Sequence, residues 1–137
     1  KISNNSDKYD FVLTNRFLVK NSLKNWPLLR IILTHASHLL LKNLLGLKHD
    51  TSGAFRLINT NKVKLKDLLL ANDNDYAYFW KSIFYLKKKK YNIGEIPIIL
   101  PARIAGSSKM SFWHIIRGVL SLFIFALLNI FKKNYST

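Results

Sequence analysis

Arginine is rare among the basic residues of this chain, so its positions are the first place to look for chemistry. Lysine and arginine together number 22, and the arginines are Arg16, Arg30, Arg56, Arg103 and Arg117. A guanidinium group is a planar fork of N–H donors that fits the oxygens of phosphate or carboxylate better than an ammonium group does. Any one of these arginines, taken alone, is best interpreted as part of an ordinary surface salt bridge.

Two loops place further polar groups beside arginines. In the first, Asp50-Thr51-Ser52-Gly53-Ala54-Phe55-Arg56, a carboxylate, two hydroxyls and a turn-forming glycine precede Arg56. In the second, Arg103-Ile104-Ala105-Gly106-Ser107-Ser108-Lys109-Met110, two cations, hydroxyls and a glycine could cradle phosphate. Each loop also has a plain interpretation, as a turn capped by Asp50 and as a solvated loop.

Composition narrows the class of partner. The 137 residues suffice for one domain, 49% of them are hydrophobic, and the net charge of +15 favours an anionic partner such as a phosphorylated substrate or a membrane surface. Nucleic acid is disfavoured, because aromatic residues such as Phe123 and Phe125 lie in apolar runs rather than among lysines. The absence of cysteine excludes disulfides and thiol catalysis. The pair His35 and His38 is interpreted as a surface or interface pair rather than as metal ligands.

Hydrophobic patterning places these loops in an α/β domain. We expect a buried strand at residues 9–13, ended by the turn-prone Thr14–Asn15, and a helix from Pro27 to Gly46. Further along we expect a short helix that Asn61 caps and that runs through Leu69, a turn at 72–75, a helix at 76–86, an edge-like or terminal strand at 93–100 because of Pro97, and a loop at 103–110. Two or three strands would leave apolar faces uncovered, and the chain opens at Lys1 rather than Met, so we expect a fragment that lacks an N-terminal part.

From Ser111 onward the chain is predicted to be one helix in contact with a membrane. Its uncharged stretch, residues 118–131, falls short of a bilayer core, so a comfortable transmembrane span is not expected. His114, Arg117 and Ser121 form a polar stripe, which favours a first half that lies in the interface. The second half is apolar all round and has no visible partner in this chain, which favours burial in lipid. The alternative is a core helix that docks on the missing part.

Five motifs occur in an order and spacing that resemble a known family. They are Asn15-Arg16-Phe17, then Asn25-Trp26-Pro27-Leu28-Leu29-Arg30, then Asp50 to Arg56, then Ile93-Gly94-Glu95-Ile96-Pro97-Ile98, and then Arg103 with Gly106, Ser108, Lys109 and Met110. Between about Tyr9 and Leu122, the chain resembles the C-terminal half of a family 2 glycosyltransferase of the dolichol-phosphate mannosyltransferase and polyprenyl-phosphate glycosyltransferase group.

The resemblance implies a fold and an activity. The fold would be the C-terminal, acceptor-side part of a GT-A (Rossmann-like) domain at residues 1–110, followed at 111–137 by an amphipathic-to-apolar, membrane-associated helix and a basic tail. The activity would be that of a hexosyltransferase that transfers mannose from GDP-mannose, with inversion, to a polyprenyl (dolichyl) phosphate at the cytoplasmic face of a membrane. A membrane partner subunit is possible in this group. Two alternatives stay open: another donor such as UDP-glucose, or a non-enzymatic basic membrane-binding module.

The resemblance also implies roles for individual residues. Arg16, Arg30 and Thr34 correspond to the group that holds the lipid phosphate, with Thr34 where serine is common. Asp50 and Arg56 correspond to the acceptor-side wall, Arg56 as a phosphate ligand and Asp50 as a catalytic residue. Arg103, also expected to be catalytic, and Ser108 and Lys109 correspond to the loop that closes over the donor diphosphate.

Two departures from the family pattern affect these expectations. The Asp-x-Asp motif that binds Mg²⁺ or Mn²⁺ would lie upstream of Lys1, so this chain holds no metal ligands of that motif and is expected to be inactive alone. Lys81 stands fourteen positions before Glu95, where the family usually has an acidic residue. Either this cation alters the electrostatics of the site, or Lys81 is one more solvated lysine.

Overall fold

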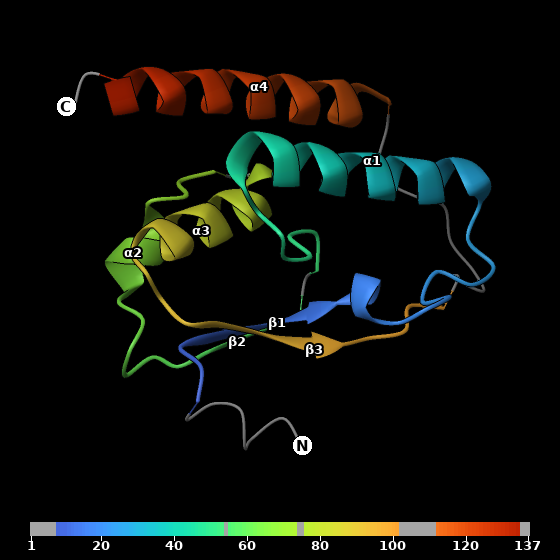
Figure 1. The fold of residues 1–137 in the computed structure, drawn as a ribbon, viewed down its shortest axis with the longest axis horizontal. Coiled ribbons are helices and arrows are strands. Elements are labelled where there is room, and N and C mark those ends of the chain that lie inside the picture. The colour runs from blue at the N-terminus through green and yellow to red at the C-terminus, as the bar shows by residue number, and fades with distance from the viewer. Residues whose placement is uncertain (1–7, 54, 74–75, 102–111, 135–137) are drawn as a thin grey trace.

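The chain folds as three strands and four α-helices, described by a computed structural model for residues 8–53, 55–73, 76–101 and 112–134 (Figure 1). The elements are β1 (Phe11–Asn15), the 3-10 helix η2 (Arg16–Leu18), α1 (Leu28–Leu45), β2 (Arg56–Ile58), α2 (Leu65–Leu69), α3 (Ala77–Lys88), β3 (Ile93–Pro97) and α4 (Phe112–Asn134). This mixed arrangement confirms the predicted α/β class.

β1 lies at the centre of the sheet. The strand order is β2-β1-β3, with β2 antiparallel and β3 parallel to β1. The predicted end of β1 at Leu13 was wrong by two residues: the strand continues to Asn15, because pairing with β3 extends to Pro97. The Asn15 side chain then accepts a hydrogen bond from the Phe17 amide and starts η2. Pro97 ends β3 at the sheet edge, which confirms the predicted edge position.

The helices form two further layers. α1, α2 and α3 lie on one side of the sheet, and α4 lies beyond them, against α1 and α3 (Figure 1). The core lies between the sheet and the middle layer. Its buried members come from all layers: Phe11, Leu13, Leu41, Leu47, Val63, Leu68, Ala77, Trp80, Ile83, Leu86 and Leu122. Burial of this apolar surface is the main stabilising contribution to such a fold.

The predicted helix from Pro27 to Gly46 is confirmed. Pro27 is the N-cap of α1, and Gly46 ends it in the left-handed conformation at φ 65°, where a side chain would cost energy. The cap predicted for α2 was wrong. α2 starts after Lys64, while Asn59 rather than Asn61 closes the preceding turn: its side chain accepts from the Asn61 amide, and its carbonyl accepts from Val63.

Gly94 has a packing role in the Gly-Glu-Ile-Pro motif. The ring of Tyr9 lies against it, so closely that an added Cβ would come within 2.5 Å of the ring. Gly94 pairs with Val12 in the register between β1 and β3. Any larger residue would therefore push Tyr9 away from the sheet edge.

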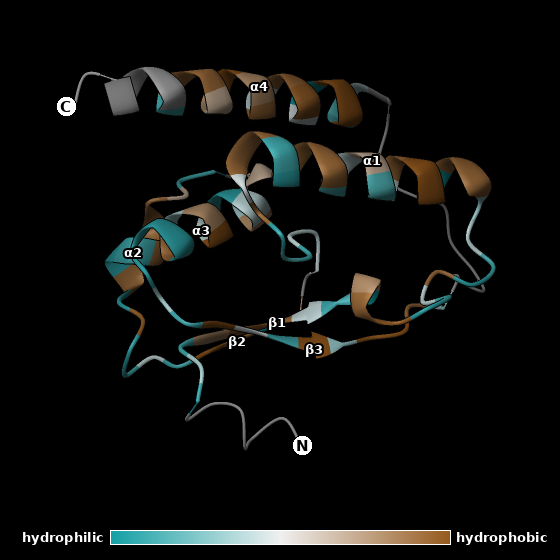
Figure 2. Cartoon of the chain, in the orientation of Figure 1, coloured by the Kyte–Doolittle hydropathy of each residue, from teal (hydrophilic) through white to brown (hydrophobic). Residues whose placement is uncertain are grey.

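α4 docks on this chain, contrary to the expectation that its apolar half has no partner here. Leu122 and Ala126 are buried, and the Phe125 ring packs edge-on against Trp80, Phe84 and Tyr85. The opposite face stays exposed, and Figure 2 shows hydrophobic residues along both α1 and α4. No helix in the described ranges has the combined length and apolar character that crossing a membrane requires. Membrane association of this helix, and the division of the chain at residue 110, stay predictions.

Candidate functional site

Arg16 is a buried arginine that is held by only one side of its guanidinium group. It follows β1 directly, is 7% exposed, and its Nε atom donates to Asp50 Oδ2 at 2.7 Å. Its backbone amide donates to the same oxygen at 3.1 Å. Within the described part of the chain no hydrogen bond engages Nη1 or Nη2. Arg16 is therefore fixed in orientation while its two terminal amino groups keep their donors for a ligand.

The Asp50 loop is built to hold that carboxylate in place. Asp50 is 1% exposed, and its second oxygen, Oδ1, accepts from the amide and the hydroxyl of Ser52, which closes an Asx turn. Gly53 brings this loop against β1, since an added Cβ would lie 3.0 Å from the Thr14 carbonyl oxygen. The predicted turn capped by Asp50 is thus present. Asp50 contacts Arg16 rather than facing open solvent.

Arg30 is the second cation of the site, and an indole ring positions it. Its guanidinium carbon lies 4.1 Å from the centre of the Trp26 ring, and that of Arg16 lies 6.0 Å from the same centre. Asn25, at φ 66°, turns the chain just before Trp26, a conformation that asparagine tolerates better than most residues do. The described residues contain no hydrogen-bond acceptor for the Arg30 guanidinium. We call Arg16 and Arg30 the arginine pair, and the Trp26 ring its indole.

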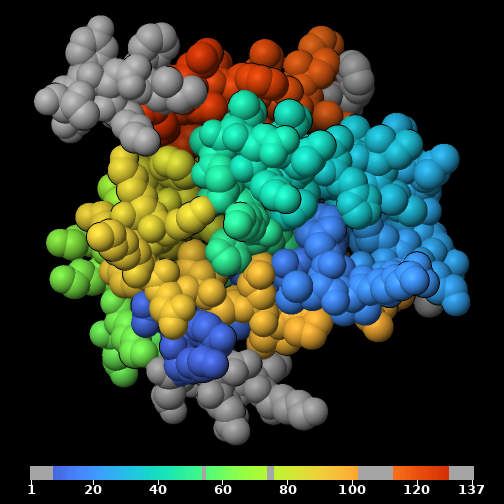
Figure 3. Space-filling view, in the orientation of Figure 1, coloured from blue at the N-terminus to red at the C-terminus, as the bar shows by residue number. Residues whose placement is uncertain are grey.

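The start of α1 adds to the positive potential and also presents hydrocarbon. Arg30 lies in the first turn, which contains no acidic residue, and the N-terminal end of a helix favours anions. Leu28 and Leu29 beside it are 72% and 69% exposed. Thr34 lies one turn further along, where its hydroxyl donates to the Arg30 carbonyl at 2.8 Å. In Figure 3 the segment that leads into α1 forms one end of the molecule, and the start of α1 lies exposed on the surface beside it.

Arg56 is a different kind of arginine, since protein acceptors take four of its five N–H donors. Nη1 donates to Ser82 Oγ at 2.6 Å, and Nη2 donates to the carbonyls of Thr51 and Phe79. Nε donates to the Gly53 carbonyl at 3.3 Å. Burial lowers the pKa of Arg56 to about 10, while the neighbouring Tyr78 and Asp50 act in the opposite direction. The Arg56 guanidinium still carries its charge at neutral pH. Its hydrogen bonds tie the Asp50 loop to α3.

A polar cluster on β3 borders the Asp50 loop. Glu95 Oε1 accepts from Asn15 Nδ2 at 2.8 Å, and His49 Nδ1 lies 3.2 Å from the same oxygen without the alignment of a hydrogen bond. Burial acts to raise the pKa of Glu95, but the contacts with His49 and Asn15 outweigh it, so the pKa is lowered. Glu95 is therefore a carboxylate at neutral pH.

The two histidines of α1 pack on one ring. The Phe17 ring stacks on the His38 ring with 4.2 Å between the ring centres, and the centre of the His35 ring lies 5.4 Å from that of Phe17. Burial lowers the pKa of His38, which keeps it neutral at pH 7 although Asp50 acts to raise it. His38 therefore adds no positive charge to this region at neutral pH.

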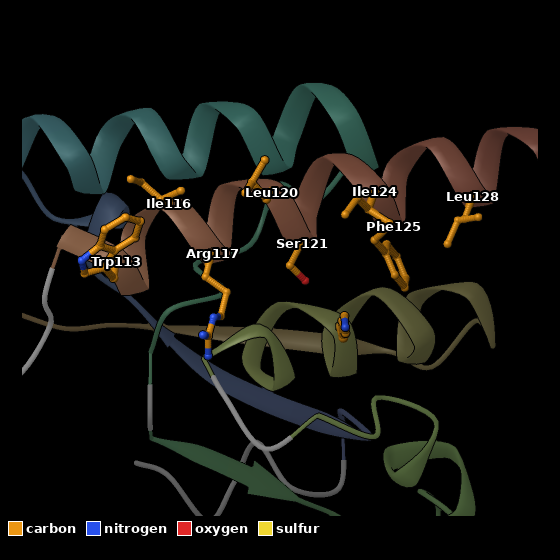
Figure 4. A pocket seen from close by; sticks show the side chains of 9 residues that line it. Trp113, Ile116, Arg117, Leu120, Ser121, Ile124, Phe125 and Leu128 are labelled. Carbon is orange, nitrogen blue, oxygen red and sulfur yellow. The ribbon is translucent and has the colours of Figure 1, made fainter.

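Lys81 is paired, so its interpretation as one more solvated lysine was wrong. Its Nζ lies 2.6 Å from Asp73 Oδ2, and its side chain is 17% exposed. With Arg117 and Ser121 of α4 it lines a cavity of about 570 Å³, whose wall is otherwise apolar. Figure 4 shows Arg117 and Ser121 pointing from α4 toward α3. The effect of Lys81 on donor choice stays a prediction.

The described residues do not fit a divalent cation. No three histidine, aspartate or glutamate side chains in the described ranges gather in a way that could hold a metal ion. The predicted donor-loop residues Arg103, Ser108 and Lys109 lie outside the described residues. The last described contacts before them are the Leu100 amide with the Ser22 carbonyl, and the Leu100 carbonyl with Trp26 Nε1 at 2.9 Å.

The structure thus brings together only part of the predicted site. Arg16 and Arg30 lie beside Trp26, Asp50 holds Arg16, and Thr34 lies one helical turn after Arg30. Arg56 points away, under α3. Trp26 was given no role from the sequence, although an aromatic residue four positions before an arginine at a helix start was an available signal.

Comparison with known proteins finds a distant relative of this chain. The chain is 25% identical over 107 residues to the polyprenol monophosphomannose synthase of Mycolicibacterium smegmatis (strain ATCC 700084 / mc(2)155). The match covers 74% of this chain and 39% of that protein, so the chain spans about two fifths of the length of this relative. No family model matches, and no solved structure matches significantly. The likeness links the chain to glycosyltransferases at a coarse level.

Proposed function

We propose that this chain forms the acceptor side of a glycosyltransferase that transfers a sugar to the phosphate of a polyprenyl lipid. One observation carries the proposal: Arg16 and Arg30 are both oriented, their remaining donors bind no described residue, and exposed leucines precede Arg30 at the start of α1. The combination matches an amphipathic anion, which has a phosphate at one end and hydrocarbon at the other. The name of the distant relative, a polyprenol monophosphomannose synthase, supports the same class of acceptor.

In the proposed complex, the arginine pair and its indole bind the lipid phosphate. The Nη groups of Arg16, held by Asp50, donate to one side of the phosphate, and Arg30 donates from the helix start. The Thr34 hydroxyl already donates its hydrogen to the Arg30 carbonyl, so it has none left for a ligand. Its oxygen can still accept from a protonated ligand group. Leu28, Leu29 and Ile32 are exposed and lie where the first isoprene units would leave the phosphate.

This arrangement fits a reaction that needs little activation of the nucleophile. An oxygen of the lipid phosphate attacks the anomeric carbon, the bond from that carbon to the nucleoside diphosphate breaks, and the configuration inverts. The products are the sugar phosphate lipid and the nucleoside diphosphate. Because the phosphate is already anionic, the protein has to orient it and stabilise charge. Arg103, Ser108 and Lys109 are proposed to neutralise the leaving diphosphate.

Two residues take revised roles in this proposal. Asp50 acts as a positioning residue through Arg16, in place of direct contact with reacting atoms, because it is buried behind that guanidinium. Arg56 is left out of the phosphate ligands, because its donors are used by protein oxygens. Mg²⁺ or Mn²⁺ stays an expectation for the full protein. The described residues do not fit a metal site.

GDP-mannose is the proposed donor, and UDP-glucose is the alternative. The relative's name supports mannose as the transferred sugar. The proposed location is the cytoplasmic face of a membrane, with a membrane partner subunit as a further possibility. The exposed leucines of α1 and the outer face of α4, with Phe123, Ile124 and Leu127, support membrane contact.

A sugar-transfer assay with the full protein tests the proposal. Radiolabelled GDP-mannose and UDP-glucose are offered with a polyprenyl phosphate in detergent micelles, to wild type and to Arg16→Lys, Arg30→Lys and Arg103→Lys. We expect transfer from GDP-mannose, with kcat/KM lowered at least about tenfold in each variant, because a point charge loses the bidentate geometry. The matched control is Lys42→Gln, which removes an exposed charge elsewhere on α1 and should change kcat/KM less than about twofold.

Two results would contradict the proposal. Unchanged kcat/KM in all three variants would remove the arginines from the site. Binding of anionic vesicles without transfer from either donor would favour the alternative of a basic membrane-binding module.

A further inference from the structure

The cavity between α3 and α4 is lined chiefly by one stripe of α4. Residues at intervals of three or four along that helix share a face, and the lining follows such a series: Trp113, Arg117, Leu120, Ile124 and Leu128. Lys81 is the lining residue that α3 supplies. The volume of about 570 Å³ lies within the roughly 300–1,000 Å³ that is typical of small-molecule sites.

The apolar wall of this α3–α4 cavity is open to solvent. Leu120, Ile124 and Leu128 are each more than half exposed, although Leu122 and Ala126 of the same helix are buried. Docking of α4 therefore leaves this stripe uncovered by the described residues. Exposed apolar side chains that gather in a concave site favour binding of an apolar group.

Polar groups interrupt the apolar wall at one place. Arg117 and Ser121 point from α4 toward α3, and Lys81 Nζ lies 5.6 Å from the centre of the Phe125 ring (Figure 4). None of the described residues accepts a hydrogen bond from the Arg117 guanidinium. Lys81 is paired with Asp73, so two cations against one carboxylate leave one net positive charge. The cavity therefore suits a ligand with a single negative charge beside an apolar part.

We propose that the α3–α4 cavity binds a phospholipid whose phosphodiester headgroup carries one negative charge. Arg117 and Ser121 donate to the phosphate oxygens, and Lys81 adds its charge from α3. An acyl chain lies along Ile124 and Leu128, which follow Ser121 along α4 (Figure 4). This lipid is separate from the proposed acceptor, because neither Arg16 nor Arg30 lines the cavity.

A lipid fits this wall better than a polypeptide does. A peptide or a second copy of the chain would bring backbone N–H and C=O groups against the leucines, where they find no partners. An acyl chain brings none. The net charge of +15 also favours approach to a membrane surface that contains anionic phospholipids.

Calorimetric titration of the protein with dihexanoylphosphatidylglycerol, a short phospholipid that dissolves as single molecules, tests the inference. We expect saturable binding, at least about tenfold tighter than that of dihexanoylphosphatidylcholine, whose headgroup has no net charge. Glycerol phosphate, which has no acyl chains, should bind at least about tenfold more weakly as well.

Two pairs of variants locate the site. Arg117→Gln should weaken binding of the short phosphatidylglycerol at least about tenfold, whereas Lys88→Gln, which removes an exposed charge of α3 outside the cavity, should change it less than about twofold. Ile124→Ser should weaken it about fivefold, whereas Leu127→Ser, at a similarly exposed position outside the cavity, should leave it within about twofold. Thermal unfolding checks that all four variants, each at an exposed position, stay folded.

Three results would overturn the inference. Equal losses of affinity in Arg117→Gln and Lys88→Gln would mean attraction by net charge alone. An absence of saturable binding would do the same, and a dimer in sedimentation that Ile124→Ser dissociates would then assign the cavity to a second copy of the chain. Displacement of the phospholipid by a short polyprenyl phosphate would mean that both lipids share one site.

The inference and the proposed function can fail separately. Arg30→Lys should leave the affinity for the short phosphatidylglycerol unchanged, because Arg30 does not line the cavity. Arg117→Gln should likewise leave the affinity for polyprenyl phosphate unchanged. Loss of phosphatidylglycerol binding in Arg30→Lys would overturn the separate site while leaving the acceptor site in place.

Discussion

Arg16 and Arg56 both lie beside the Asp50 loop, but the protein uses their donors differently. Arg16 donates through Nε to Asp50, and none of the described residues accepts a hydrogen bond from its two terminal amino groups. Arg56 donates to Ser82, Thr51, Phe79 and Gly53, so protein oxygens take four of its five N–H donors. An arginine indicates a ligand site only where some of its N–H donors make no hydrogen bond within the protein.

The hydrogen-bond partners of each arginine also explain what it contributes to the fold. Asp50 holds Arg16 in one orientation, and Trp26 does the same for Arg30 through its ring, so neither needs a second acceptor to be ordered. Arg56 joins β2 and the Asp50 loop to α3. Substitution of Arg56 should therefore lower stability alone, whereas substitution of Arg16 should lower both stability and ligand binding.

The largest expected effect is that of Arg16→Gln on stability. Without the guanidinium, the buried Asp50 carboxylate loses its charge partner, which should lower the free energy of unfolding by roughly 3 kcal/mol. Urea unfolding at pH 7 measures the change. The double variant Arg16→Gln with Asp50→Asn should regain part of it, because no buried charge is then unpaired. An unchanged urea midpoint in the single variant would mean that Asp50 does not depend on Arg16.

Arg56→Lys should come next. A single ammonium cannot replace the guanidinium donors to Ser82 Oγ and to the Thr51 and Gly53 carbonyls at once, so some of these acceptors lose their donors and the free energy of unfolding should fall by about 2 kcal/mol. The phosphate affinity of the folded protein should not change. Weaker phosphate binding at unchanged stability would return Arg56 to the phosphate ligands and remove the contrast with Arg16.

Lys81→Glu should have a smaller effect. The substitution brings a second carboxylate beside Asp73, where the ion pair now has a 2.6 Å separation, and should lower the free energy of unfolding by about 1 kcal/mol. Lys81→Met, which removes the charge and keeps the apolar stem, serves as the control and should cost less. A Lys81→Glu protein as stable as wild type, with altered donor preference, would instead support the family-like carboxylate.

Glu95→Gln should have the smallest effect, visible only in acid. Because the pKa of Glu95 in the folded chain is below the ordinary 4.5, its contribution is present above about pH 4.5 and is lost as pH falls through the folded pKa. Wild type should therefore lose stability more steeply than Glu95→Gln in that window, by less than about 1 kcal/mol because the group is partly exposed. Parallel pH profiles of the urea midpoint would contradict the lowered pKa.

Sequence reasoning predicted the element order because its signals are local. Pro27 and Gly46 mark the ends of α1, since each restricts the backbone at its own position. The end of β3 was missed, because the strand was predicted to reach residue 100 and stops at Pro97. The end of β1 was missed, because pairing with a strand about eighty residues away decides it. The docking of α4 on Trp80 and Phe84 was missed for the same reason.

The candidate site was predictable only as a set of residue types. Motif order placed Arg16, Arg30 and Arg56 together, but their partners come from distant segments that spacing does not specify. The contact of Arg56 with α3 and the contact of Trp26 with Leu100 both depend on the folded arrangement. Which arginine keeps its donors therefore required coordinates.

Calorimetric titration of the protein with farnesyl phosphate, a short polyprenyl phosphate, tests the central claim most directly. Wild type should bind it saturably, more tightly than inorganic phosphate and without comparable binding of farnesol, because the arginine pair needs the phosphate and the start of α1 needs the hydrocarbon. Arg30→Lys should weaken binding about tenfold while Lys42→Gln leaves it unchanged. Equal affinities of wild type and Arg30→Lys, or equal binding of farnesol, would contradict the account.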